Sequence, residues 1–516
     1  MDNPISEPAS PTSFDHDPTD PRRELERNLR PANWQNPDPA KCYNLAVIGA
    51  GPAGLTAARI AARLGARVAL IEAGAIGGDC TNIGCVPTKA IIRSGQVFSD
   101  MRHASHFGVH APDTIFDPAL ALARVRKAQA RISRMESADR LRSEGIDVFF
   151  GNGCFANRRS LRVGDQTIRF SRAIVATGGA LRQPDVPGLQ DIGYLTVETL
   201  FNRDTLPKSI MVIGGGPLGC EMAQALCRLG VRVVLIQNAP KFLPREERDA
   251  AQFLSESLAR DGIEIHLNTT AVGARQTAQG KEIALTTGGD PFSITVDEVL
   301  TGVGRTPRIV GLGLEAAGVA ADPETGIRVD DHMRTSNRRI FAAGDVCGGF
   351  MFTHVADAAA RLAVRNALFF GRGRYSRLTI PWCTFTDPAI AHVGLYVDQA
   401  ISQGIAVKTY TVLMHQVDRA VTDGEETGFV KIHVRQGTDR IIGATVVARH
   451  AGEMLNEITL AMQRRIGLRA LSGVIHAYPT QSAAIKSAAD ACRADRLTPR
   501  LRRLSGWWMS LMRRAG

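Results

Sequence analysis

Two glycine-rich turns, each joining a short apolar strand to a helix, constrain the fold of this chain most strongly. The first contains Gly49, Gly51 and Gly54, and the second contains Gly214, Gly216 and Gly219. In such a turn the glycines permit a tight reversal, close approach of a pyrophosphate and close packing of helix on strand. The helix N-terminus supplies free N–H groups to the anion. The repeat predicts an α/β chain with two Rossmann-like dinucleotide-binding domains.

The residue that ends the next strand differs between the two units. Glu72 lies eighteen residues after Gly54, at a position where a carboxylate accepts hydrogen bonds from ribose hydroxyls. The equivalent position after Gly219 holds Gln237, which does not repel a 2′-phosphate, and Lys241 follows as a source of positive charge. This pattern favours NADPH at the second site, although Gln also accepts a ribose hydroxyl and leaves NADH open.

The rest of the chain suggests further segments. Beyond residue 370 the pattern changes to separate strands and amphipathic helices, which predicts a C-terminal α+β domain for dimerisation. Residues 1–43 are rich in Pro, Asp and Asn without apolar periodicity, and we expect a mobile arm there. The expected segments are an arm at 1–43, a first dinucleotide-binding domain at 44–187, a second at 188–305, the continuation of the first at 306–372, an interface domain at 380–490 and a basic tail at 493–516.

Composition excludes several classes of protein. The 516 residues contain no apolar run long enough to span a bilayer and no N-terminal signal pattern, so we expect a cytoplasmic protein, with a peripheral position on the inner face of the membrane left open. The net charge of +11 includes +6 from the last 24 residues, which contain seven arginines and one acidic residue, Asp495. The body is therefore only mildly basic, and no nucleic-acid partner is expected.

One cysteine pair stands apart among the nine cysteines. Cys80 and Cys85 flank four residues in a glycine-rich stretch directly after the first strand-helix-strand unit. Pro87 fits the first turn of a helix, so the helix dipole and Lys89 favour a thiolate at Cys85. The alternatives are two inert cysteines or half of a metal site, but zinc sites usually have closer spacing and no second pair exists to complete one. We predict a redox pair and no metal site.

These motifs together resemble the class I flavoprotein pyridine nucleotide-disulfide oxidoreductases, the family of dihydrolipoamide dehydrogenase, glutathione reductase and mercuric reductase. The resemblance covers about residues 43–490 and implies an enzyme and a homodimer that passes electrons from NAD(P)H through FAD to the disulfide. It places Cys80 at the thiol that meets the substrate and Cys85 at the thiol that contacts the flavin. Further matches are the ion pair near the reactive flavin nitrogen and the nucleotide-binding signatures, namely Lys89, Glu221, Thr177, Gly178, Gly304 and Asp345.

One departure from the family concerns the acceptor. The family's dithiol-specific members use a His/Glu dyad around a Pro-Thr pair, and here Tyr478 and Ala483 occupy those two positions while His476 lies two residues earlier. A phenol titrating near about 10 is a poor proton shuttle at neutral pH. Tyr478 and His476 are expected to line the acceptor pocket from the partner subunit.

The resemblance leaves the acceptor class open. Mercuric-reductase-like sequences share Tyr near this place, but the sequence has no N-terminal Cys-x-x-Cys domain, and its last cysteine is the single Cys492. Efficient mercuric ion reduction is therefore not expected. A small thiol or disulfide, another metal ion or a quinone is expected, with a dihydrolipoamide dehydrogenase of a 2-oxo-acid complex as the alternative.

The C-terminal tail has a different pattern. Apolar residues recur at spacings of 4, 3, 4 and 3, with arginines on the remaining surface, which is typical of an interfacial helix. This predicts membrane-surface contact through residues 496–514 and suggests a membrane-docked redox sensor or electron-donor module as a further alternative. A helix packed on the partner subunit gives the same pattern. The apolar residues are Leu497, Leu501, Leu504, Trp508 and Leu511.

Overall fold

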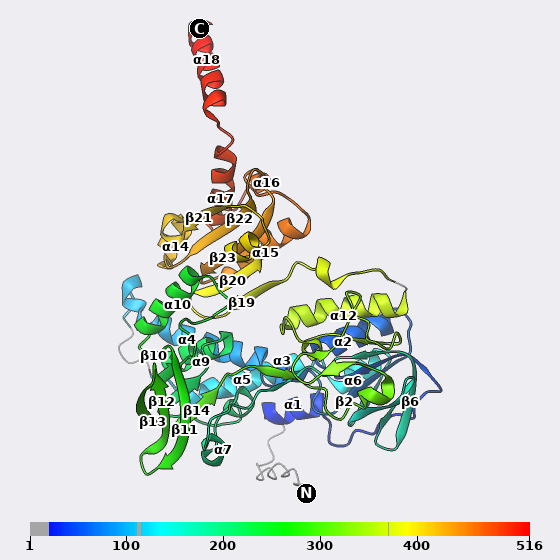
Figure 1. The fold of residues 1–516 in the computed structure, drawn as a ribbon. Helices are drawn as coiled ribbons and strands as arrows, with labels where there is room; N and C mark the ends of the chain where they lie inside the picture. The colour runs from blue at the N-terminus through cyan, green and yellow to red at the C-terminus, as the bar shows by residue number, and fades with distance from the viewer. Residues whose placement is uncertain (1–19, 111–114, 370, 516) are drawn as a thin grey trace.

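The first glycine turn lies in a sheet whose core is parallel. The computed structural model describes residues 20–110, 115–369 and 371–515, and Figure 1 shows the arrangement of their elements. Because β1 pairs with both β2 and β6, the turn after β1 opens at the carboxyl edge in the middle of the sheet. The parallel strands, in spatial order, are β3 (Ile146–Phe150), β2 (Val68–Glu72), β1 (Tyr43–Ile48), β6 (Gln166–Val175) and β18 (Ile340–Ala342).

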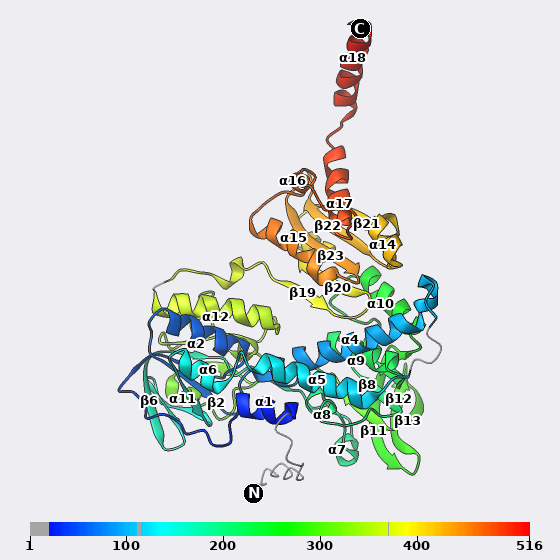
Figure 2. The same cartoon turned by 180° about the vertical axis from the view of Figure 1, so that it is seen from behind.

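Helices and an antiparallel extension complete this first domain. The helices α2 (Pro52–Arg63) and α12 (Thr353–Leu368) pack side by side against the sheet (Figure 2). The N-terminal half of β6 pairs antiparallel with β5 (Ser160–Val163), and β5 pairs antiparallel with β4 (Gly153–Asn157). Nearly every side chain of β1 is buried, as expected for a central strand covered on both faces.

The second domain repeats the arrangement on a smaller scale. The glycine turn joins β8 to α9, and a three-stranded antiparallel sheet is appended before the last parallel strand. Its parallel strands, in spatial order, are β10 (Glu264–His266), β9 (Arg232–Ile236), β8 (Ser209–Ile213) and β14 (Glu298–Thr301). Its helices and appended strands are α9 (Pro217–Arg228), α10 (Arg248–Arg260), β11 (Thr269–Thr277), β12 (Gly280–Thr287) and β13 (Asp290–Val296).

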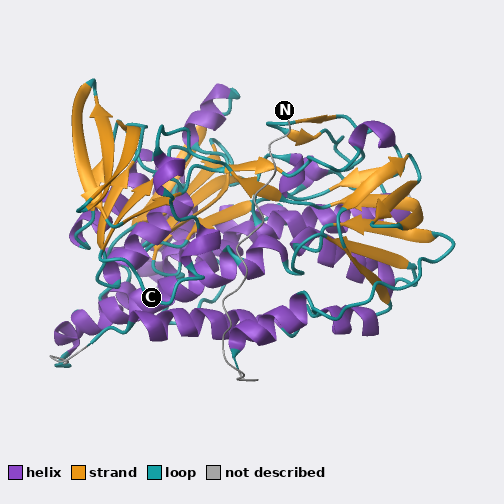
Figure 3. Cartoon of the chain, turned by 90° about the horizontal axis from the view of Figure 1, so that it is seen from below, coloured by secondary structure: helices purple, strands orange, loops and turns teal. Residues whose placement is uncertain are grey.

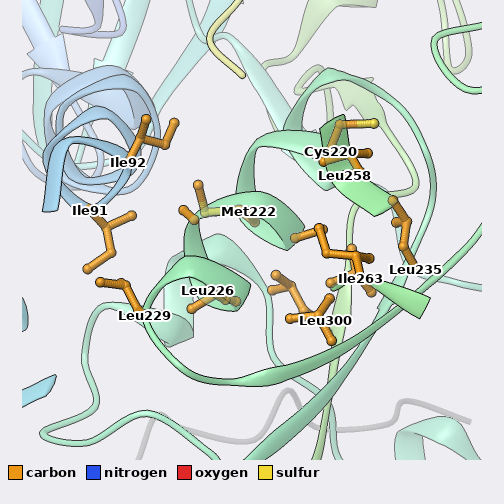
Figure 4. Close-up of a cluster of buried hydrophobic side chains, with 14 of the residues drawn as sticks. Ile91, Ile92, Cys220, Met222, Leu226, Leu229, Leu235, Leu258, Ile263 and Leu300 are labelled. Carbon is orange, nitrogen blue, oxygen red and sulfur yellow. The ribbon is translucent and has the colours of Figure 1, made fainter. Parts of the chain in front are cut away.

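A long helix joins the two nucleotide-binding domains. α4 (Cys85–Arg102) leaves the first domain and packs on α9 of the second and on α5 (Pro118–Ser133). Figure 4 shows Ile91 and Ile92 of α4 facing Met222 and Leu226 of α9 in one apolar cluster. The core of the second domain is therefore continuous with the helix that begins at Cys85.

The C-terminal part forms a separate layer. Five antiparallel strands pack against α15 (Ala451–Gln463) and α17 (Ala483–Ala494), and Figure 3 shows sheets toward both ends of the molecule with helices between and alongside them. The predicted architecture, two Rossmann-like domains and a C-terminal α+β domain, is confirmed. In spatial order the strands are β19 (Pro381–Thr384), β20 (Ala389–Gly394), β23 (Ile441–Ala448), β22 (Phe429–Arg435) and β21 (Val407–Leu413).

The last helix of the chain extends beyond the C-terminal domain. α18 (Pro499–Ala515) follows α17 and points away from the C-terminal domain in both ribbon views (Figures 1 and 2). Within the described residues, no helix is both long enough and apolar enough to cross a membrane. The domain boundaries given above stay a prediction.

The expectation of a mobile arm is wrong for residues 20–43. Asp20 caps α1 (Pro21–Leu29) through the backbone N–H of Arg22, and the helix packs on α5 with Leu29 buried. The Trp34 indole then donates to the carbonyl of Val148 at 3.2 Å. These contacts depend on polar caps and single apolar side chains rather than on a periodic apolar face, which is why the pattern did not indicate them. Residues 1–19 of the expected arm lie outside the described residues.

Substitution of Leu29 tests whether this segment is part of the folded domain. Leu29 is 1% exposed and shares a core with Leu141 and Val148. We expect Leu29→Ala to destabilise the domain by about 2 to 5 kcal/mol through the cavity left behind. The measurements are the melting temperature and limited proteolysis across residues 20–43. Leu64→Ala, at a side chain that is 58% exposed, is the matched control. Equal melting temperatures and equal proteolysis of the two variants would mean that residues 20–43 are a mobile arm after all.

Candidate active site

The first glycine turn is shaped by backbone contacts that leave no room for side chains. Gly49 has φ +99°, and a Cβ atom there would collide with the carbonyl of Ala176. A Cβ atom at Gly54 would collide with the carbonyl of Gly49. Gly51 begins α2 as its N-cap residue without a side-chain cap, so the N–H groups of the first helical turn have no capping side chain there. The turn therefore exposes backbone donors, as the sequence predicts for a pyrophosphate site.

Glu72 supports this turn from the end of β2. Its two carboxylate oxygens accept hydrogen bonds from the backbone N–H of Ala50 at 2.6 Å and of Gly74 at 2.7 Å. Burial raises the pKa of Glu72, while the two N–H groups oppose that shift. The carboxylate thus contacts the glycine turn itself.

A cavity of about 500 Å³ extends from this turn to the cysteine pair. Its wall includes the turn, the strand end at Thr177 and Gly178, and the loop at Asp345. Gly178 has φ +71°, and nothing lies close to a Cβ atom built on it. Burial raises the pKa of Asp345, against the opposing charge of Arg305. Cys80 and Cys85 both line the same cavity.

The two cysteines lie on successive helices. Cys80 is in α3 (Gly78–Asn82), and Cys85 is the first residue of α4. A hydrogen bond from the Cys80 thiol lowers the pKa of Cys85 to about 6, and the Thr353 hydroxyl, 3.3 Å away, and Lys89 act in the same direction against burial. The same hydrogen bond, together with burial, raises the pKa of Cys80. The pair therefore favours the thiolate on Cys85 and the protonated thiol on Cys80.

An ion pair lies one helical turn beyond Cys85. Lys89 Nζ is 2.7 Å from Glu221 Oε2, and Glu221 is buried on α9. The second carboxylate oxygen accepts the backbone N–H of Phe385 at 2.8 Å, and the Lys89 ammonium lies 4.8 Å from the centre of the Phe385 ring. Burial of a carboxylate is costly unless it is paired, and here both of its oxygens have partners.

The second glycine turn differs from the first in the residue that supports it. Gly214 has φ +112°, and a Cβ atom at Gly219 would collide with the Gly214 carbonyl, so the backbone geometry repeats. Gln237 Oε1 accepts the N–H of Gly215 at 2.8 Å, the role that Glu72 has in the first turn. The side chain is buried and neutral.

Other predicted residues lie around this second turn. Gly216 is the N-cap residue of α9, and Gly304 has φ +103° beside the end of β14. The Lys241 ammonium donates to the Glu246 carbonyl at 3.1 Å and is partly exposed.

The two residues predicted at the acceptor pocket have separate partners. Tyr478 is 77% exposed, and its hydroxyl donates to Asp418 at 2.8 Å, which raises the pKa of the phenol. The side chain of His476 is only 8% exposed, and its Nε2 lies 3.0 Å from Glu457 of α15. His476 thus belongs to a pair within its own domain, whereas Tyr478 is presented on the surface.

Several contacts of the site were not predicted. Thr353, at the start of α12, contacts Cys85 from 268 positions away in the chain. Arg305 forms an ion pair with Asp79, the neighbour of Cys80. Phe385 reaches Glu221 from the strand region of the interface domain. Each joins distant segments, and no local spacing in the sequence indicates such pairs.

The residues present fit a dinucleotide with an attached ring system. The first glycine turn, which has no room for side chains, the open backbone at Gly178 and the half-buried Asp345 line one continuous cavity that also reaches the thiols. FAD matches this combination of pyrophosphate, ribityl and redox-active ring. The second turn offers the same backbone arrangement to a nicotinamide dinucleotide.

Comparison with known proteins gives the family. The model of the pyridine nucleotide-disulphide oxidoreductase family matches residues 43–360, and the model of that family's dimerisation domain matches residues 380–489. A mercuric reductase of Staphylococcus aureus is 31% identical over 447 residues, which are 87% of this chain and 82% of the relative. A dihydrolipoyl dehydrogenase of Thermus scotoductus is 33% identical over 457 residues, which are 87% and 97% of the two chains.

Solved structures agree with these relatives. LpdA from Mycobacterium tuberculosis superposes with a TM-score of 0.80 at 31% identity and covers 87% of this chain and 99% of its own. A Cu(II) complex of RclA, an HOCl-induced flavoprotein disulfide reductase from Escherichia coli, gives 0.76 at 28% identity, covering 86% and 98%. The chain belongs to the pyridine nucleotide-disulphide oxidoreductase family, whose members bind FAD, use a pyridine nucleotide and contain a redox-active disulfide.

Proposed function

We propose that this enzyme transfers electrons from NADPH, through bound FAD, to the Cys80–Cys85 pair and on to a small disulfide, a soft metal ion or a quinone. The observation that supports this most is the shared cavity, which the first glycine turn and both cysteines line. FAD, when bound, supplies the step between a hydride donor and a two-electron dithiol.

The roles of the chain's own residues follow from their environment. Gly49, Gly51 and Gly54 bind the FAD pyrophosphate, and Glu72 holds that turn and faces the ribose. The side of the cavity formed by Thr177, Gly178 and Asp345 receives the ribityl chain and the ring. The Lys89–Glu221 pair places a cation one helical turn from Cys85, where it stabilises the thiolate and would lie near the ring when FAD is bound.

The two cysteines divide the work by their protonation. Cys85 faces the ring as a thiolate, and Cys80 keeps the proton and meets the acceptor. When an acceptor takes two electrons, a bond forms between the two sulfur atoms and the proton of Cys80 is released. For a disulfide acceptor, its S–S bond breaks, and one sulfur leaves as a thiol with the Cys80 proton while the other leaves as a thiolate that takes its proton from water, which balances the two electrons.

The second site favours NADPH. Gln237 replaces the carboxylate that would repel a 2′-phosphate, and its amide still holds Gly215 in place. Lys241, four residues further along the chain, is partly exposed and donates to the Glu246 carbonyl, and we propose it as the source of positive charge for the 2′-phosphate. Gly214, Gly216, Gly219 and Gly304 supply the close backbone approach.

Restoring a carboxylate at Gln237 tests this preference. We expect Gln237→Glu to lower kcat/KM for NADPH relative to NADH by about tenfold, because the new charge repels the 2′-phosphate while still accepting the Gly215 N–H. The measurement is the ratio of kcat/KM for the two donors with a one-electron dye as acceptor. Gln276→Glu, on an exposed part of β11, adds the same charge as a control. An unchanged ratio in Gln237→Glu would contradict the assignment.

The surroundings of Tyr478 disfavour dithiol substrates, because their described residues offer no acid–base group suited to neutral pH. The phenol is hydrogen-bonded to Asp418, and its raised pKa makes it a poor proton acceptor at neutral pH. His476 is largely covered and paired with Glu457, so it acts as a structural residue rather than as a replacement base. This arrangement disfavours the alternative of a dihydrolipoamide dehydrogenase. The relative RclA, solved as a Cu(II) complex, supports a metal ion among the open acceptors.

Rebuilding the dyad tests this interpretation. We expect the double variant Tyr478→His with Ala483→Glu to raise dihydrolipoamide oxidation by about a hundredfold, since a positioned acid–base pair contributes on that scale. A negative charge at position 483 is favourable toward the helix dipole because that residue is the first of α17. Tyr478→Phe with Ala483→Glu is the matched control. Rapid turnover of dihydrolipoamide by the unmodified enzyme would instead identify a dihydrolipoamide dehydrogenase.

A further inference from the structure

The last helix of the chain presents an apolar face with nothing packed on it. Leu501, Leu504, Trp508 and Leu511 follow one another at spacings of 3, 4 and 3, so they lie on one side of α18. Their side chains are between 39% and 61% exposed. We call these four residues, with Met512 beside them, the apolar face.

The opposite side of α18 is positively charged. Residues 496–516 contain six arginines and no acidic residue, a net charge of +6 (6 − 0). None of these arginines up to Arg514 forms a side-chain hydrogen bond or ion pair with another described residue. At 100° per residue, five of them occupy an arc centred opposite the apolar face. This arginine arc consists of Arg500, Arg502, Arg503, Arg513 and Arg514.

The domain that α18 leaves is anchored just before it. Cys492 is buried, and the Asp495 carboxylate accepts from the Tyr410 hydroxyl and pairs with Lys408. Residues 496–498 then separate this anchor from α18, which points away from the domain (Figures 1 and 2). The helix therefore presents both its faces outside the folded body.

We infer that α18 docks this enzyme on an anionic phospholipid surface, lying in the plane of the interface with its apolar face in the acyl boundary. Arginines flank the apolar face on both sides, which places them at headgroup level when the helix is half immersed. Trp507 and Met509 lie at the two borders of the face, and the indole of Trp is preferred at that depth.

Two other partners fit these observations less well. A second copy of the tail would bring a further six arginines and no carboxylate to pair with them, so the two helices repel each other. A groove on a protein would take the apolar face alone and leave the arginine arc without partners, whereas at a membrane surface the arginines at the borders of the face reach anionic headgroups and the rest of the arc contacts water. The docking inference does not depend on the nature of the electron acceptor.

Vesicle co-sedimentation of the full-length, FAD-loaded enzyme tests the inference. The probes are vesicles of phosphatidylcholine alone and of phosphatidylcholine with phosphatidylglycerol. We expect pelleting only with the anionic vesicles, and release at high salt. Trp508→Glu places a charge in the apolar face and should weaken the partition at least about tenfold. Ser510→Glu makes the same change of charge within the arginine arc, one turn from Arg513 and Arg514, and should retain most of the binding.

Each other outcome overturns the inference. Absence of pelleting with either vesicle would mean that a protein covers the apolar face, and equal pelleting with neutral vesicles would remove the role of the arginines. Equal loss in the two variants would show that charge alone drives binding. NADPH oxidation in solution and retained flavin absorbance confirm that both variants are folded, because α18 lies outside the catalytic cavity.

Discussion

The packing of α4 against α9 is the contact on which the rest of the site depends. The two helices approach so closely that a Cβ atom at Gly95 would lie 3.1 Å from the carbonyl oxygen of Ala225. Because α4 begins at Cys85 and α9 follows the second glycine turn, this contact sets the thiolate relative to both nucleotide sites. The Lys89–Glu221 ion pair joins the same two helices at the end nearest the cysteines.

The electrostatics of the site follow from this packing. A buried carboxylate on α9 requires a cation, and the cation that reaches it from α4 also stabilises the thiolate one turn earlier. The hydrogen bond between the cysteines then shifts their pKa values in opposite directions, which supports the proposed division of roles between the ring and the acceptor. The family fold provides this core, while Tyr478 and the tail distinguish this chain.

The parts that were predictable from sequence are those set by local backbone geometry. Both glycine turns, the cysteine pair on a helix N-terminus and the amphipathic α18 follow from spacing within short segments. Thr353 beside Cys85 and Phe385 on Glu221 depend on tertiary contacts over long separations, and no local pattern contains them. The helix at Pro21–Leu29 was missed because a capped polar helix buried through Leu29 lacks a periodic apolar face.

The proposed relay is tested most directly by the long-wavelength absorbance of the FAD-loaded enzyme during anaerobic titration with NADPH. The three proteins to compare are the unmodified enzyme, Cys80→Ser and Cys85→Ser. A thiolate on Cys85 beside the flavin predicts a band that appears in the unmodified enzyme after two electrons, is present before NADPH is added in Cys80→Ser, where no disulfide can form, and is absent in Cys85→Ser. Because the pKa of Cys85 is lowered, to about 6, the band should be full at neutral pH and fade as the pH falls through that value. Bleaching of the flavin without this band, or a band that survives in Cys85→Ser, would contradict the proposed relay.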